Sequence, residues 1–147
     1  MATALKLVDE HGVPAFSLRM LADTLNSGTA MLYRHFESKD EIVAHIVNRV
    51  LGEVELPHLK PDAPWQDVLS AMDPRFYEVL RRHPNVVPAL IAQVPVGPHG
   101  LALRERVLRT LLERGMPADL AARAFTAAGT VSDPTPRPGM LVRSGPI

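Results

Sequence analysis

The chain carries two short helical patterns within residues 16–41, separated by a break of small polar residues. In the first pattern, four apolar residues recur at i, i+3, i+4 and i+7, which is the spacing of one helix face. These are Leu18, Leu21, Ala22 and Leu25. Ser17 precedes them, where its hydroxyl can accept hydrogen bonds from free N–H groups of the first turn. The break is Asn26-Ser27-Gly28, and Asn and Gly tolerate the left-handed backbone that a sharp turn needs.

The second pattern runs from Thr29 to Phe36 and places Leu32 and Phe36 on one buried side of a helix. Its other sides carry polar, basic and aromatic groups. Two short helices joined by a turn of roughly three or four residues are typical of a helix-turn-helix. The second helix of that motif lies in the major groove of DNA, so the pattern predicts a DNA-binding element.

Helices are also predicted on both sides of the motif. Leu5 and Val8 lie one turn apart in a first helix over residues 3–11, which Gly12 ends, and Pro14 is expected to keep the next connection extended. After the motif, Ser38 and Glu41 have the spacing of a capping box. They open a helix that is expected to run to residue 56, completing a DNA-binding domain over residues 1–56.

The second half of the chain follows the helical period as well. Three prolines between positions 57 and 64 mark a domain boundary, and residues 57–132 form the second predicted domain. Its longest stripe covers residues 65–80, where Pro74 predicts a kink or a break near Asp73. Shorter helices are predicted over residues 84–94, around residues 104–112 up to Gly115, and from Pro117 onward, with a loop at residues 95–100. Residues 133–147 contain four prolines without periodicity and are expected to be a disordered tail.

Composition narrows the function classes. Cysteine is absent, which excludes disulfides and thiolate metal sites. No apolar run could span a bilayer and the start does not look like a signal peptide, so a cytoplasmic protein is expected. The net charge is zero, which argues mildly against DNA binding because a basic surface is usual there. However, Arg19, Arg34, His35 and Lys39 cluster at the tips of the motif, so we expect weaker non-specific binding than a strongly basic repressor would show.

A family resemblance rests on four runs of residues. They are Ser17-Leu18-Arg19-Met20-Leu21-Ala22, Leu25-Asn26, Leu32-Tyr33-Arg34-His35-Phe36 and Ser38-Lys39-Asp40-Glu41. Together they resemble the DNA-binding domain of the TetR family of one-component transcriptional regulators, strongly over residues 12–42 and more weakly to about residue 132. The resemblance implies an all-α fold: an N-terminal three-helix helix-turn-helix domain, followed by a helical ligand-binding and dimerisation domain that is shorter here than is usual in the family.

The turn of the motif departs from the family pattern. Asn26 and Ser27 stand where the family usually has Gly and a buried Val, and Gly28 stands where it usually has a capping Ser. The recognition helix is therefore expected either to use Ser27 as its cap or to be less well capped. A missing cap costs about 1 kcal/mol, which is too little to abolish the motif.

The resemblance also implies which residues contact DNA. They are Arg19, Thr29, Ala30, Met31, Tyr33, Arg34, His35 and Lys39. The hydroxyl of Thr29 can bond to several bases, Met31 can meet a thymine methyl, and Arg19 can read a guanine through O6 and N7. The phenol, imidazole and ammonium groups in this set are donors to phosphate oxygens. Each residue could instead be ordinary surface, and the ring of Tyr33 could be half-buried in the core.

Other side chains give weaker signals. Six apolar residues of the second domain could line a small-molecule effector pocket, although each of them could equally well fill the hydrophobic core. They are Met72, Phe76, Val87, Ile91, Met116 and Phe125. Glu41 and His45 have metal-ligand spacing, but further acid–His pairs are missing, so a local surface pair is preferred and no metal is predicted. His83 is expected to be structural, for the same lack of partners.

The sequence thus predicts a TetR-like regulator, a repressor that binds a palindromic double-stranded operator as a homodimer. An unidentified small molecule would release it by favouring another spacing of its two DNA-binding heads. No catalytic residue, cofactor or membrane partner is predicted, because no phosphate loop, nucleophile elbow or convergent acid pair is visible. One alternative is a shortened regulator that serves as an interaction module with weak DNA binding; a small helical-bundle enzyme is less favoured.

Overall fold

The computed structural model describes residues 1–92 and 97–128, with side chains described only up to residue 123 within the last helix. Over these ranges the chain is helical. Its elements are α1 (Ala2–Ala15), α2 (Leu18–Thr24), α3 (Thr29–Tyr33), α4 (Lys39–Leu51), α5 (Trp65–Arg82), the 3-10 turn η1 (Pro84–Val86), α6 (Val87–Ala92), α7 (Pro98–Glu113) and α8 (Ala118–Ala128). None of the described helices is long and apolar enough to cross a membrane.

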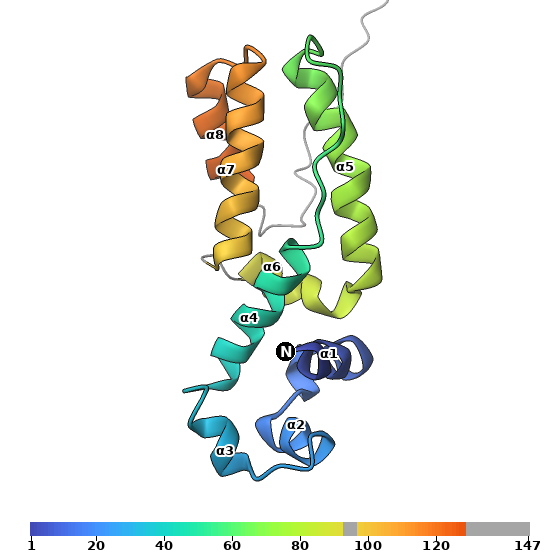
Figure 1. Cartoon of the computed structure of the whole chain (residues 1–147), viewed down its shortest axis with the longest axis vertical. Helices are drawn as coiled ribbons and strands as arrows, with labels where there is room; N and C mark the ends of the chain where they lie inside the picture. Colours follow the sequence, from blue (N-terminus) through green and yellow to red (C-terminus); the bar gives the residue numbers. More distant parts are fainter. Residues whose placement is uncertain (93–96, 129–147) are drawn as a thin grey trace, which may run out of the picture.

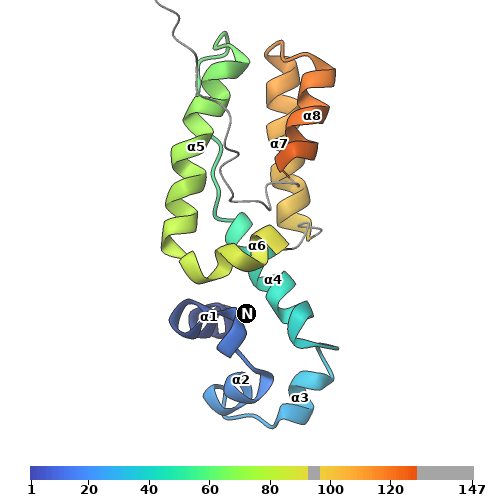
Figure 2. The ribbon, with the colours of Figure 1, turned by 180° about the vertical axis from the view of Figure 1, so that it is seen from behind.

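The molecule is elongated, with α1, α2 and α3 at one end and α5, α7 and α8 extending to the other (Figure 1). We call residues 1–36, which hold α1, α2 and α3, the head. Helix α4 runs from the head toward the second half of the chain, and α6 crosses close to it (Figures 1 and 2). This arrangement leaves α2 and α3 far from the tips of α5 and α7.

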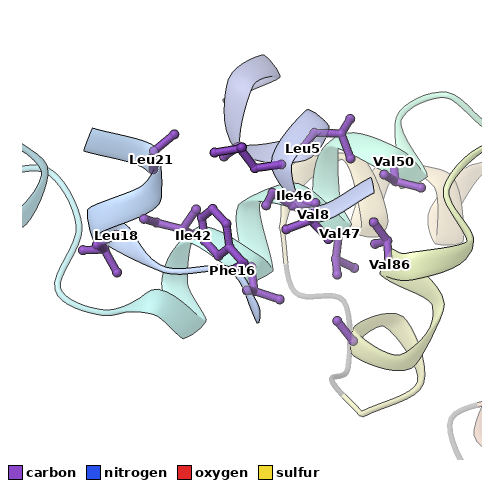
Figure 3. Close-up of a cluster of buried hydrophobic side chains, with 14 of the residues drawn as sticks. Leu5, Val8, Phe16, Leu18, Leu21, Ile42, Ile46, Val47, Val50 and Val86 are labelled. Atoms are coloured by element: carbon purple, nitrogen blue, oxygen red, sulfur yellow. The ribbon is translucent and has the colours of Figure 1, made fainter. Parts of the chain in front are cut away.

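The larger of the two apolar cores joins the head to the second half. It contains buried side chains of α1, α2, α3 and α4, together with Val79, Val86 and Ala89 from α5, η1 and α6. Figure 3 shows Val8 of α1, Val47 of α4 and Val86 of η1 gathered in this core. Residues from both sides of position 57 are therefore removed from water in one cluster, which stabilises the contact between the two parts of the chain.

The smaller core lies between α5, α7 and α8. Its buried members are Val68, Val107, Leu111, Met116 and Ala121. The segment between α4 and α5 is attached beside it, because the guanidinium of Arg114 donates to the carbonyls of Lys60 at 2.7 Å and Ala63 at 2.8 Å. The helices predicted around residues 104–112 and after Pro117 are thus present, and Gly115, with φ of +85°, ends α7 as predicted.

The first helix breaks at Gly12 as predicted, where φ is +80° and ψ is 158°. Beyond the break, the helical assignment continues to Ala15 and includes Pro14, so the prediction of an extended connection at Pro14 is wrong. Proline is tolerated there because the first turn of a helical segment does not need its N–H. The extended residue is Phe16, whose N–H donates to the carbonyl of Gly12 at 3.1 Å.

Helix α5 runs without interruption from Trp65 to Arg82, so of the predicted kink or break near Asp73 the break is wrong and the kink stays a prediction. Pro74 lies inside it and cannot donate the usual backbone hydrogen bond. The helix is held on both sides of this proline, since Val68 is buried in the smaller core and Val79 in the larger one. Burial at both ends offsets the roughly 3 kcal/mol that an interior proline costs.

Helix α4 ends at Leu51, five residues before the predicted end at residue 56. Gly52 follows as the C-cap, and its N–H donates to the carbonyls of Asn48 and Arg49. Glycine costs about 1 kcal/mol within a helix. A side chain at this position would also press on His99, because a Cβ on Gly52 would lie 3.1 Å from His99 Cγ.

Helix α4 also caps α7. The side-chain oxygen Oδ1 of Asn48 accepts from the backbone N–H of His99 at 2.8 Å and from that of Gly100 at 3.2 Å. Gly97 allows this approach, since a Cβ there would lie 2.3 Å from Asn48 Oδ1 and 2.7 Å from Asn48 Cβ. As a result α7 begins at Pro98, inside the predicted loop of residues 95–100. The predicted helix of residues 84–94 is divided into η1 and α6; residues 93–96 and the predicted tail lie outside the described residues.

We expect G97A to lower the free energy of unfolding by about 1–3 kcal/mol, because the new Cβ displaces Asn48 and removes the cap of α7. In an N48G background the same substitution should cost at least about 1 kcal/mol less, since glycine at position 48 removes the Oδ1, Cγ and Cβ atoms that a Cβ at position 97 would meet. Urea denaturation of the four variants of this cycle measures the difference. Additive costs would show that residues 48 and 97 do not interact.

Candidate DNA-binding surface

Helix α2 has the ends that its sequence predicts. Ser17 Oγ accepts from the backbone N–H of Met20 at 3.2 Å and caps the first turn. At the other end Asn26 has φ of +49°, the left-handed conformation expected of this turn. The N–H of Ser27 donates to the carbonyl of Ala22 at 3.0 Å, and that of Asn26 to Asp23 at 3.2 Å. This pair of bonds is a Schellman ending, which turns the chain sharply into α3.

Helix α3 begins without a side-chain cap. Its N-cap is Gly28, in an extended conformation with φ of −72°. Ser27 does not take the capping role, because its hydroxyl is buried and has no hydrogen-bond partner in the described part of the chain. Of the two expectations for this turn, the poorly capped helix is therefore the correct one. Leu32, which is only 7% exposed, and the partly buried Phe36 hold the helix against the larger core.

The remaining sides of α3 face solvent. Tyr33 is 61% exposed and Met31 is 49% exposed, so the alternative that the Tyr33 ring is half-buried in the core is wrong. Thr29, Ala30, Arg34 and His35 are exposed as well. Because α3 lies at the end of the molecule opposite the tips of α5, α7 and α8, these helices do not cover this face (Figures 1 and 2).

Two predicted contact residues lie outside α3. Arg19 projects from α2 with 87% of its side chain exposed, and its Nε lies 4.0 Å from Asp23 Oδ2. An ion pair this exposed contributes little, so the guanidinium can exchange Asp23 for a base. Lys39, the first residue of α4, is instead partly buried, and its Nζ donates to the carbonyl of Pro14 at 3.2 Å. Sequence reasoning missed this bond, which still leaves N–H groups of the ammonium for a phosphate.

The start of α4 is fixed by the predicted capping box. Ser38 Oγ accepts from the backbone N–H of Glu41 at 3.1 Å. The carboxylate of Glu41 reaches back to the N–H of Glu37 at 2.6 Å, one residue before the cap. Glu41 and His45 form a local pair at 4.0 Å, and the His45 ring meets Phe36 edge-on at 5.8 Å. The described part of the chain contains no group of three or more His, Asp or Glu side chains that could hold a metal ion.

The residues predicted to line an effector pocket differ in their packing. Met72 is partly buried against both cores and Phe76 against the larger one, Met116 is buried in the smaller core, and Ile91 is 52% exposed. Val87 is half-buried, and the side chain of Phe125 lies outside the described part. An open hollow of about 380 Å³ lies elsewhere on α5. It is lined by Pro74, Tyr77, Glu78, Arg81 and Arg82.

Helix α3 is exposed on its outer face and packs through its inner face on the core that α1, α2 and α4 share. This arrangement is that of a helix-turn-helix protein, in which α3 is the recognition helix. Comparison with known families agrees. Residues 1–46 match the family described as "Bacterial regulatory proteins, tetR family", and residues 56–129 match "Tetracyclin repressor-like, C-terminal domain". The chain belongs to the TetR family of bacterial transcriptional regulators, as its motif predicts, and the predicted all-α fold is confirmed.

Several relatives cover most of this chain. An HTH-type transcriptional regulator of Saccharopolyspora erythraea is 32% identical over 132 residues, which are 89% of this chain and 56% of the relative. The HTH-type transcriptional repressor DrrR1 of Streptomyces coeruleorubidus is 29% identical over 113 residues, which are 77% of this chain and 42% of DrrR1. The TetR family protein ActR of Streptomyces coelicolor, in complex with actinorhodin, has a TM-score of 0.78 and 32% identity over 88% of this chain and 61% of ActR. The chain thus spans about half of these relatives.

We expect L32A to lower the free energy of unfolding by about 2–4 kcal/mol, because it removes the buried anchor of α3 and leaves a cavity. M31A, one position earlier on the exposed side, should change it by less than about 0.5 kcal/mol. Urea denaturation of both variants makes the comparison. Equal losses would mean that the face of α3 assigned to DNA is packed against protein.

Proposed function

We propose that this protein is a DNA-binding transcriptional repressor whose helix α3 enters the major groove. The exposure of the α3 face at one end of the molecule carries this proposal, because a helix must stand clear of its own domain to reach base edges. Membership of a family of bacterial transcriptional regulators supports it.

The exposed residues divide into two roles. Thr29, Ala30 and Met31 open the recognition helix, and together with Arg19 on α2 they would meet base edges. Tyr33, Arg34, His35 and Lys39 lie at the far end of α3 and the start of α4, where they would donate to phosphate oxygens. This division separates sequence preference from overall affinity and makes the two experimentally distinguishable.

Acidic side chains surround the proposed contact surface. Asp23 lies beside Arg19, and Glu37, Asp40 and Glu41 lie around the start of α4. They oppose the approach of DNA at long range, so non-specific binding should be weak. Specific binding would then depend on correctly placed short-range contacts.

We also propose that the protein binds a palindromic operator as a homodimer in the cytoplasm. Several large apolar side chains of the second half are exposed. They are Leu69, Tyr77, Ile91, Leu101 and Leu112. Such exposed apolar groups support contact with another chain, although their positions do not define one interface. Two recognition helices would read half-sites about 34 Å apart or a multiple of this distance.

A small molecule would regulate the binding of DNA. ActR, which shares 32% identity with this chain, has been solved with actinorhodin and with (S)-DNPA. In this chain the ligand would bind in the second half, near Met72, Phe76, Val87, Ile91, Met116 and Phe125. It acts only if it binds one arrangement of the heads more tightly than the other.

The same exposed apolar side chains favour a second candidate function, an interaction module that pairs with another chain and binds DNA weakly. Light scattering at micromolar concentration, with and without a selected DNA fragment, discriminates between the two. A dimer that binds DNA supports the repressor. A monomer that selects no fragment supports the module.

Selection of bound genomic fragments is the primary test, because it reports DNA binding and palindromy together. On a selected fragment, K39A should weaken binding and reduce the slope of log affinity against log salt by about 1, since one phosphate contact is lost. K60A is the matched control, because Lys60 is an exposed lysine beyond α4. Equal effects of the two substitutions would contradict a phosphate contact at Lys39.

R19A is expected to relax the preference for one base pair of each half-site by about 1–3 kcal/mol, because the bidentate contact to guanine is lost. Binding to fragments that already lack this base pair should change little. Affinity measured on a set of single-base variants of the operator tests this. An equal loss of affinity on every operator variant would indicate that Arg19 contacts a phosphate and not a base.

Addition of actinorhodin or (S)-DNPA to the protein–DNA complex tests regulation by ligand. A ligand that binds the DNA-free arrangement about 100-fold more tightly should weaken DNA binding by up to the same factor. Fluorescence anisotropy of labelled operator follows the release. Release of DNA would indicate that the effector is chemically similar to these two compounds. Saturable binding of either compound without release of DNA would contradict ligand-controlled repression.

A further inference from the structure

His83, at the end of α5, contacts two carboxylates from other parts of the chain. Its Nδ1 lies 2.9 Å from Asp9 Oδ2 in α1, and its Nε2 lies 3.3 Å from Glu53 Oε2 in the segment after α4. The imidazole is only 12% exposed. These contacts agree with the prediction of a structural role for His83, but its two carboxylate partners lie 74 and 30 positions away in the sequence and were not predicted.

These two contacts cannot both be hydrogen bonds of a neutral ring. A neutral imidazole has one N–H and one lone pair, and a charged carboxylate can only accept. One ring nitrogen would then point its lone pair at a carboxylate oxygen. The imidazolium has two N–H groups and donates to Asp9 and Glu53 at once, so the observed geometry fits the protonated ring.

The charges around the ring support the same conclusion. Arg82 Nη1 lies 3.0 Å from the same oxygen of Glu53. Two carboxylates and one guanidinium leave one negative charge unmatched, and an imidazolium matches it. In addition, Asp9 Oδ1 is buried with no hydrogen-bond partner in the described residues, so this carboxylate depends on its contact with His83 through Oδ2.

The cluster connects the head to the second half. Asp9 belongs to α1, Glu53 follows α4, and Arg82 and His83 end α5. The side chain of Asn85 in η1 adds a neutral bond, since its Nδ2 donates to the backbone carbonyl of Asp9 at 2.7 Å. We call these five residues the clasp. A clasp of directional bonds fixes the angle at which the head meets α5, which apolar packing alone does not specify.

We propose that His83 is a positioning residue for the DNA-binding head and that it acts as an imidazolium. The proton completes the clasp, which holds α1 and the end of α4 against α5 in the arrangement that binds DNA. Without that proton the ring can donate to only one of the two carboxylates, so one contact would be lost and the head would be less well oriented. The DNA-binding part of this inference rests on the proposed function; the clasp itself does not.

The protonation state can be read in the free protein. In the full chain labelled with ¹⁵N-histidine, H83Q identifies the resonances of His83. At about pH 6, both ring nitrogens of His83 should carry protons. A ring that is already neutral at that pH would overturn the proposal.

Thermal unfolding tests what the proton contributes. Between about pH 6 and pH 8, the Tm of the wild type should fall by about 4 °C relative to the Tm of H83Q, since the variant has no ionisable group at position 83. D9N should reduce this fall, because an amide can donate to the lone pair of a neutral ring. H58Q, which alters an exposed histidine of the connecting segment, should match the wild type. Parallel curves for the wild type and D9N would overturn the proposal even if H83Q does not fold.

Binding of DNA tests the positioning role. At about pH 6, H83Q should bind the selected operator roughly three- to tenfold more weakly than H58Q, with an unchanged salt dependence because no phosphate contact is lost. Comparison at one pH removes the contribution of His35, which both variants keep. Equal affinities would overturn the positioning role. If the wild type selects no DNA, the proposed function fails, while the resonances and the melting curves still decide whether the clasp is protonated.

Discussion

The structure depends on the burial of α4 in a core that the head shares with the second half. Ile42, Val43, Ile46, Val47 and Val50 are nearly inaccessible to solvent, although they belong to a helix of only 13 residues. One part of this surface packs against α1 and α2, and another reaches η1 and α6. Because the buried residues of α4 contact both parts, the helix cannot turn relative to one without disturbing its packing against the other.

Apolar burial provides most of the free energy of this joint, whereas polar groups at its edge determine its geometry. The amide of Asn48 fixes the start of α7 on α4, and the carboxylates of Asp9 and Glu53 fix the end of α5 between α1 and α4. Hydrogen bonds are directional and weaken steeply when they bend. A ligand that shifts α5 or α7 by a small distance would therefore act on α4 through discrete bonds as well as through a close-packed core.

The sequence predicted features that depend on local pattern and missed those that depend on distant contacts. The helical spacing of apolar residues located the helices, and Gly12 and Gly115 marked the ends of two of them. The motif identified an exposed helix that begins at Thr29. Packing on both sides of Pro74 kept α5 intact, which no local rule predicts. Partners of Lys39 and His83 are far away in sequence, so their hydrogen bonds were invisible. Apolar periodicity also cannot distinguish a pocket wall from a core, so the effector residues stay a prediction.

The contact between Asn48 and Gly97 has a consequence for how this family can vary. Any side chain at position 97 must displace an asparagine at position 48, because even a methyl group would lie 2.3 Å from its Oδ1 and 2.7 Å from its Cβ. A lineage that acquires a larger residue at position 97 loses stability unless the residue at position 48 changes or shifts as well. The two positions, 49 apart in sequence, should therefore change together among homologues that keep this junction, and the order of the two replacements is restricted.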